Sequence, residues 1–418
     1  MNLRPRRVHV AILLLVLVQL YSLATGFAAF SRLTLILAAA LVSAYAWSRF
    51  GLRGIGVFVE WSSARARVGD PLSGWLEVVN HSRFPKPFLE VRDLTTIPEL
   101  HPGRVISLEP HGVQGWRTQV VARQRGVFHV GPVEVTSRDP FGLFRRSRRF
   151  SERQEVLIYP ASDPLPGFQP MMLGVPGDGS RPRPSLQPTP SVSHVREYLP
   201  GDSLGRIHWP TTARSGRLMV KQFDHEVGND LWLLLDLDAA RQVGHGDDGT
   251  EEHAVHAAAS VAERALSLGV PVGLIASGAE PYYFAADRGP AQMGRILDAL
   301  ARVRSGGDLS LGATLESGQV RLRRGNLMVI TASMDPAWVW SLGRLLRAPG
   351  QVVAALLDPS SFGGEEPVEP MAAILADAGV HSYVLRRGVP LAESFANQGP
   401  TAIAAWRAGD GNGRGGDS

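Results

Sequence analysis

The hydrophobic pattern begins with two long apolar runs. Residues 8–30 carry no Asp, Glu, Lys or Arg, and a second run, 33–47, follows Arg32. A membrane-spanning helix needs about 20 largely apolar residues, and about 17 at the least. The first run meets that length, and the second meets it if Arg32 extends its side chain to the interface. The pattern predicts a transmembrane hairpin over residues 1–50.

The arginines around these runs predict their orientation. Three arginines precede the first run, Arg49 and Arg53 follow the second, and only Arg32 lies between them. Because positive charge concentrates on the cytoplasmic side, we expect a two-span inner or plasma membrane protein with cytoplasmic soluble domains. A cleaved signal peptide is the alternative, but the second run would then remain as an anchor.

Residues 56–160 change to short alternating segments separated by turn residues. The segments VFVEW, GWLEVVN, FLEVRDL, RTQVVAR, VFHVGPVEVTS and EVLIYP have the pattern of strands. Many short strands with no helical period predict a β-sandwich.

The remaining chain divides by composition. Residues 161–193 are rich in Pro, Gly and Ser, which predicts a linker or long surface loop. Across 194–407, apolar strands such as LWLLLDLD alternate with helical segments, a rhythm typical of a doubly wound α/β sheet. Residues 408–418 are expected to form a flexible tail.

The net charge and the cysteine content exclude some classes of chemistry and of binding partner. The net charge is +4 at pH 7 and there is no cysteine, which excludes disulfides, thiol nucleophiles and cysteine-bound metals. We expect no nucleic-acid partner, because binding one needs a concentrated basic face. The exception is the run Arg145, Arg146, Arg148 and Arg149. A solvated strand end is its simplest interpretation, with lipid headgroups and nucleic acid as alternatives.

Candidate chemistry is sparse. Asp236 and Asp238 end the first predicted α/β strand, and Asp308 follows a Gly-Gly pair expected at the same edge. Such oxygens suit Mg²⁺, although acidic residues often end strands for structural reasons. GDSLG (201–205) matches Gly-x-Ser-x-Gly, but Pro200 and Pro210 exclude the strand and helix that this elbow needs. The sequence presents no convincing catalytic set, and we expect no cofactor other than this cation.

The richest stretch is REYLPGDSLGRIHWPTTARSGRLMV (196–220). In one interpretation Ile207, Trp209 and Ala213 anchor a loop in the core while arginines pair with carboxylates. In the other, the loop presents a surface for a partner. The candidate partner-binding residues are Arg196, Glu197, Tyr198, Gly201, Asp202, Arg206, Trp209 and Arg214.

This stretch closely resembles the signature of the bacterial family called domain of unknown function 58 (DUF58). The two apolar runs and the segments VGDPLSGWLEVVNHSR, QRGVFHVGPVEVTSRDPFGLF and VLIYPA also resemble that family. The resemblance implies a von Willebrand factor type A-like domain at 194–407. It also implies association with a MoxR-type AAA+ ATPase and the membrane proteins encoded beside it.

The chain departs from the motifs of these families. Gly205 stands where the signature usually has Arg. The metal motif of von Willebrand A domains, Asp-x-Ser-x-Ser, is matched only at Asp236, since Asp238 and Ala240 replace its serines. Asp308 stands at the expected Thr, and Ala332 at a later Asp. A metal-free binding domain is therefore expected.

We accordingly expect a membrane-anchored, protein-binding accessory of a MoxR-type ATPase system that acts in protein maturation or regulation. A divalent-metal hydrolase using the Asp236, Asp238 and Asp308 edge is the first alternative. An envelope-facing structural protein with inverted topology is the second.

Overall fold

A computed structural model describes residues 5–26, 28–100, 103–169, 192–197, 207–223, 230–307, 310–317, 325–344 and 352–396. The chain divides into two compact units, Met1–Ala161 and Ser162–Ser418. Each unit is described by itself.

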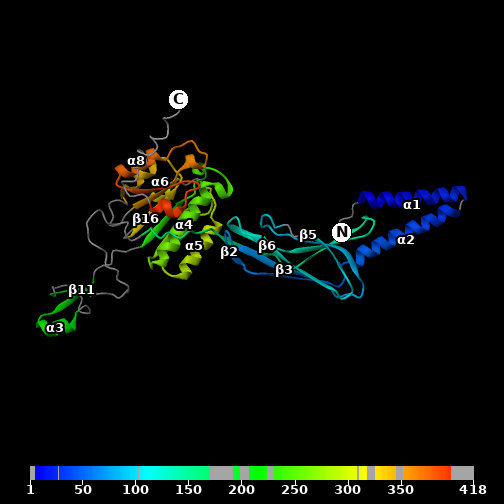
Figure 1. Ribbon diagram of the computed structural model, residues 1–418, viewed down its shortest axis with the longest axis horizontal. Helices are drawn as coiled ribbons and strands as arrows, with labels where there is room; N and C mark the ends of the chain where they lie inside the picture. The colour runs from blue at the N-terminus through cyan, green and yellow to red at the C-terminus, as the bar shows by residue number, and fades with distance from the viewer. Residues whose placement is uncertain are drawn as a thin grey trace, which may run out of the picture. The chain divides into compact units, whose positions relative to one another are not determined.

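The first unit opens with two helices, α1 (Pro5–Thr25) and α2 (Ala28–Phe50) (Figure 1). Both are long and apolar enough to cross a membrane, with mean hydropathies of 2.1 over Val8–Thr25 and 1.6 over Ala28–Phe50. The side chain of Lys86 caps the C-terminal end of α2, because its Nζ donates a hydrogen bond to the Phe50 carbonyl at 3.0 Å. Cations are favourable at this end of a helix.

The strands that follow form three sheets among the described residues, ordered β1-β3-β6, β2-β10-β7 and β5-β4-β8-β9. Their bounds are β1 Ile55–Trp61, β2 Arg65–Arg67, β3 Pro71–Asn80, β4 Lys86–Asp93, β5 Gly103–Leu108, β6 Val113–Val121, β7 Gly126–Val130, β8 Val133–Arg138, β9 Arg145–Phe150 and β10 Gln154–Tyr159. The first and third sheets share one core, in which Val78 of β3 and Val91 of β4 are fully buried. Alternation of apolar and polar residues produces these half-buried strands.

The second unit begins inside the predicted linker. Phe168 is 2% exposed, and its ring meets Phe395 and Tyr383 at centroid distances of 5.2 and 6.2 Å. The Arg264 guanidinium donates to the carbonyls of Pro166 and Phe168. The expectation that this segment stays outside the core is therefore wrong for residues 162–169. The rest of the predicted linker up to residue 191, and the predicted tail, lie outside the described residues.

A mixed six-stranded sheet forms the centre of this unit, in the order β15-β14-β13-β16-β17-β18. Its strands are β13 Leu231–Asp236, β14 Val272–Ser277, β15 Tyr282–Asp287, β16 Asn326–Thr331, β17 Val352–Leu357 and β18 His381–Leu385. All neighbours are parallel except β14 and β15. The sequence pattern did not predict the edge strand β15.

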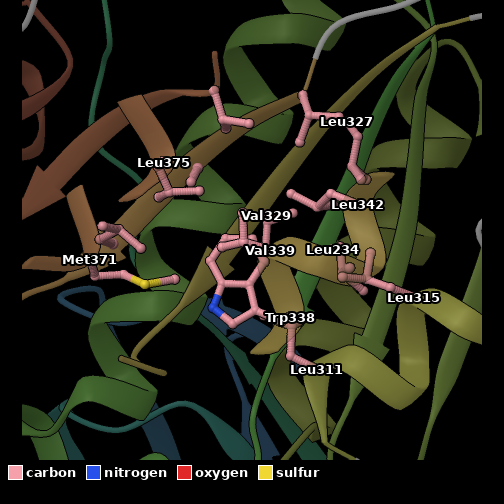
Figure 2. Close-up of a cluster of buried hydrophobic side chains, with 14 of the residues drawn as sticks. Leu234, Leu311, Leu315, Leu327, Val329, Trp338, Val339, Leu342, Met371 and Leu375 are labelled. Atoms are coloured by element: carbon pink, nitrogen blue, oxygen red, sulfur yellow. The ribbon is translucent and has the colours of Figure 1, made fainter. Parts of the chain in front are cut away.

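Helices cover both faces of the sheet. The described helices here are α4 Thr250–Ser267, α5 Pro290–Arg302, α6 Leu311–Glu316, α7 Ala337–Ser341, α8 Glu369–Asp377 and α9 Leu391–Ala396, with 3₁₀ turns η3 Ala239–Arg241, η4 Gly246–Asp248, η5 Leu342–Arg344 and η6 Pro359–Phe362. Helices α4 and α5 pack side by side (Figure 1). On the other face α6, α7 and α8 bury a separate cluster, and Figure 2 shows the indole of Trp338 among Val329, Val339 and Leu311. Alternate residues of each strand serve the two faces.

Candidate functional site

The strand order of the central sheet reverses between β13 and β16. β13 continues in the chain to β14 on one side, whereas β16 begins the series on the other side. In open α/β sheets, ligands bind beyond the carboxyl ends of the strands at such a switch point. The candidate site is therefore the loop that follows β13 together with the loop that follows β16, here called the switch-point rim.

The centre of the rim is a buried hydrogen bond between the two strand ends. Asp236 ends β13 and is 1% exposed, while Thr331 ends β16 and is fully buried. Thr331 Oγ1 donates to Asp236 Oδ2 at 2.6 Å, and the Asp238 amide donates to Asp236 Oδ1 at 3.2 Å. The Ser333 amide donates to Thr331 Oγ1 at 2.8 Å. Both carboxylate oxygens are thus engaged by the protein itself.

Burial raises the pKa of Asp236. Hydrogen bonds from Thr331 and the Asp238 amide lower this pKa, the Asp238 charge raises it, and the Arg241 charge lowers it. Removal from water dominates because it disfavours the charged form. Its neighbours Thr331 and the Asp238 amide hold the carboxyl group in one position.

A second link joins the two loops at the surface. Arg241 in η3 reaches Asp335 beyond β16, with Nη2 and Oδ2 3.2 Å apart. Both side chains are partly exposed, at 36% and 43%. Asp335 Oδ1 also accepts from the Ala337 amide at 2.9 Å and so holds the start of α7. The rim therefore combines a partly exposed ion pair, Arg241–Asp335, with the buried hydrogen bond between Thr331 and Asp236.

Two of the three expected metal ligands, Asp236 and Asp238, make hydrogen bonds within the protein. Asp236 is engaged as described, and Asp238 accepts from the Ala240 amide at 3.0 Å as the cap of η3. Asp308 lies outside the described residues. Within the described ranges, no group of three or more His, Cys, Asp or Glu residues has an arrangement that could hold a metal ion. Metal binding stays a prediction.

The signature stretch forms a two-stranded sheet of its own. β11 (Val192–Glu197) pairs antiparallel with β12 (Met219–Phe223), and neither strand belongs to the six-stranded sheet. Between them lies α3 (Trp209–Ser215), which ends at Gly216 with φ 67°, a left-handed cap that favours glycine.

The signature side chains fall into three groups. Ile207 is buried as expected, but Trp209 is 65% exposed and Ala213 is exposed, so neither anchors a core. Glu197 Oε1 lies 3.6 Å from Arg217 Nη1, a partner that the sequence did not single out, whereas Arg214 is exposed in the last turn of α3. Tyr198, Gly201, Asp202 and Arg206 lie outside the described residues, as does the side chain of Arg196.

Sequence reasoning missed Thr331, Ser333, Asp335 and Arg241. The signal for Thr331, Ser333 and Asp335 was TASMD (331–335), hydroxyl and carboxyl groups at the end of a buried apolar strand and directly after it. This pattern gains meaning only when β16 is known to lie beside β13.

The chain is similar to two curated relatives that are named as uncharacterized proteins. The chain is 28% identical over 213 residues to the uncharacterized protein YeaD of Bacillus subtilis, covering 50% of this chain and 51% of the relative. It is 32% identical over 200 residues to the uncharacterized protein Rv1480 of Mycobacterium tuberculosis, covering 44% and 57%. The chain thus spans little more than half the length of these relatives. Neither name includes an enzymatic activity.

Similarity to solved structures is low. Proximal thread matrix protein 1 from the mussel byssus matches with a TM-score of 0.31 and 11% identity, over 41% of this chain and 46% of that chain. The CARDB domain of PF1109 from Pyrococcus furiosus matches with a TM-score of 0.20 and 15% identity, over 25% and 94%.

The family comparison is more specific. The family model described as "Protein of unknown function DUF58" matches residues 194–361, which include the signature stretch, Asp236 and Thr331. The resemblance read from the sequence is thereby confirmed for this part of the chain, which is a DUF58 region.

Proposed function

We propose that this chain is a membrane-anchored, protein-binding accessory of a MoxR-type AAA+ ATPase, acting in protein maturation or regulation. The observation that carries the binding role is the engaged carboxylate of Asp236. A catalytic base or nucleophile must reach a reacting group, whereas both Asp236 oxygens already accept hydrogen bonds within the protein. The ATPase as partner comes from the family resemblance.

The proposed docking surface is the switch-point rim. The Arg241–Asp335 pair joins the two loops that flank the switch point and leaves both side chains partly exposed. A buried hydrogen bond below it holds the loops in one geometry, and such preorganisation reduces the entropy lost on binding.

The finer fold assignments are also proposals. A von Willebrand A-like fold for the α/β unit is supported by its strand order, by the antiparallel edge strand β15 and by Asp236 at the end of its first sheet strand. A β-sandwich for the strand-rich region is supported by the core that two of its sheets share.

The first experiment is affinity capture from native membranes with the full-length chain. We expect recovery of a MoxR-type ATPase, reduced severalfold by Arg241→Ala or Asp335→Ala. Arg295→Ala is the matched control, because Arg295 pairs with Asp287 at the opposite end of the sheet with similar exposure. Equal recovery with all variants would refute docking at the rim, and no recovered ATPase would refute the accessory role.

The proposed orientation puts both soluble units in the cytoplasm, supported by the arginines that flank the two helices. A C-terminal alkaline phosphatase fusion should be inactive. Activity of that fusion would instead favour the envelope-facing structural protein.

The competing function is a divalent-metal hydrolase at the same rim. The position of Asp236 and Asp238 at the switch point supports this alternative. Titration of the full chain with Mg²⁺ separates the two. Tight stoichiometric binding that Asp236→Ala abolishes would favour the hydrolase.

A further inference from the structure

The turn between β8 and β9 lies against the apolar helices of the first unit. Helix α2 contacts both strands, and the rings of Tyr45 and Phe144 meet edge to face with centroids 5.6 Å apart. Gly51, just past α2, packs so closely on Ser137 that a side chain there would clash. An apolar cavity of about 240 Å³ lies between the turn and both helices, lined by Leu14, Leu15, Leu37, Leu41, Phe141 and Leu143.

These contacts define the depth that the turn reaches along α2. Leu41 lies near the centre of the apolar run 33–47, and Gly51 follows ten residues later, about 15 Å along a helix. Half the hydrocarbon thickness of a bilayer is also about 15 Å. A membrane spanned by α2 therefore places Gly51 and Ser137 near its surface, and Phe141 within its hydrocarbon.

The turn itself suits an apolar environment. Residues 140–144, PFGLF, carry no charge, and Phe141 is 61% exposed. The carboxylate of Asp139 accepts from the amides of Phe141 at 2.9 Å and Phe144 at 2.5 Å, while the Gly142 amide donates to the Asp139 carbonyl at 3.1 Å. Because these three amides are satisfied within the turn, the cost of placing its backbone in hydrocarbon is lower.

Arginines begin where the turn ends. β9 is an edge strand whose Arg146 pairs in register with Ser137, the residue beside Gly51. Arg146 and Arg149 make no salt bridge to any described residue, and Arg148 stacks on Phe150 at 4.8 Å. Guanidinium groups bind phosphate with paired hydrogen bonds, and this row begins at the level where α2 would leave the membrane.

We propose that the Asp139–Phe144 turn inserts into the membrane leaflet beside α2 and that the β9 arginines bind the phosphates of anionic phospholipids. This inference rests on the membrane anchoring proposed above. It makes the strand-rich region a membrane-bound body with a fixed orientation. The charge of β9 and the continuity of the turn with the apolar helices favour lipid over a protein or nucleic-acid partner.

Depth measurement with spin labels tests the insertion. The chain has no cysteine, so Phe141→Cys, Leu35→Cys and Val121→Cys each provide one labelling site in the full chain. Leu35 is an exposed residue of α2. Val121 is an exposed residue at the end of β6, and it pairs with Pro71 at one end of β3, whereas Ile55, which follows the helices, pairs with Asn80 at the other end. In phosphatidylcholine–phosphatidylglycerol nanodiscs, labels at Phe141 and Leu35 should be accessible to oxygen and shielded from a nickel chelate. The label at Val121 should show the reverse.

The pattern of failure distinguishes the two proposals. A lipid-like label at Leu35 with a water-exposed label at Phe141 overturns the insertion and leaves the anchor intact. Water exposure at both positions overturns the anchor and the insertion together. A Phe141 label shielded from both reagents indicates a packed protein contact and also overturns insertion into lipid.

Lipid selectivity tests the arginines. Native mass spectrometry of the full chain should show retention of phosphatidylglycerol over phosphatidylcholine, reduced severalfold by the double variant Arg146→Gln and Arg149→Gln. The charge-matched control is Arg117→Gln with Arg153→Gln, exposed positions on β6 and before β10. Equal retention by both double variants would overturn the role of β9.

Discussion

Thr331 and Asp236 lie 95 residues apart in the sequence and are joined by a buried hydrogen bond of 2.6 Å between Oγ1 and Oδ2. The bond crosses the boundary between β13 and β16, where the strand order reverses. It ties together the two loops that form the switch-point rim. The stability of the rim therefore depends on a pair whose members end neighbouring strands.

Thr331→Val should lower the free energy of unfolding by about 1–3 kcal/mol, because it leaves buried acceptor and donor groups unpaired at nearly constant volume. The acceptor left unpaired is Asp236 Oδ2 and the donor left unpaired is the Ser333 amide, each of which bonds to Thr331 Oγ1. Denaturant unfolding of the full chain in detergent measures the change. Thr118→Val on β6 is the control, and equal effects of the two variants would contradict a special role for Thr331.

Asp236→Asn should change how stability depends on pH. Burial raises the folded pKa of Asp236 above its ordinary value of 3.8. The folded state thus binds this proton more tightly than the unfolded state. The contribution of Asp236 to stability is fully present below pH 3.8 and is lost as the pH rises through the folded pKa. The stability of the native chain relative to the variant should fall over that interval, measured by thermal unfolding. A difference that is constant with pH would contradict the raised pKa.

Trp209→Ala should change the free energy of unfolding by less than about 0.5 kcal/mol, the usual range for a surface substitution. A tryptophan anchored in the core, which is one of the two interpretations of the sequence, would have cost about 3–5 kcal/mol, but Trp209 is largely exposed. Ile207→Ala, at the buried neighbouring position, should cost about 2–5 kcal/mol. Denaturant titrations of both variants test this reversal. A larger loss for Trp209→Ala would show that the indole is covered.

Phe168→Ala should lower the free energy of unfolding of the second unit by about 3–5 kcal/mol, because it empties a buried aromatic site. The lost contacts are those with Phe395 and Tyr383. Differential scanning calorimetry on the full chain measures the shift, with Phe84→Ala at an exposed position as the control. An unchanged transition would mean that residues 162–169 act only as a linker.

The elements that could be predicted from the sequence are those whose pattern of apolar residues lies within one short segment. The apolar runs predicted α1 and α2, and LWLLLDLD predicted the buried strand β13, because side-chain periodicity reports the type of an element directly. The edge strand β15 was missed for the same reason. Its residues alternate between partly buried and exposed, so it does not carry the continuous apolar pattern of a central strand.

The sequence by itself determined the two apolar helices, the change from strand-rich to alternating α/β organisation, the DUF58 signature and the position of Asp236 at a strand end. Only the tertiary structure decided that Thr331 engages Asp236, that Arg241 meets Asp335, and that Trp209 is exposed while Phe168 is buried. The physical reason is that backbone periodicity is set by neighbours in the chain. The partner of a buried polar group, in contrast, is set by which strands lie side by side, and strand order joins residues far apart in sequence.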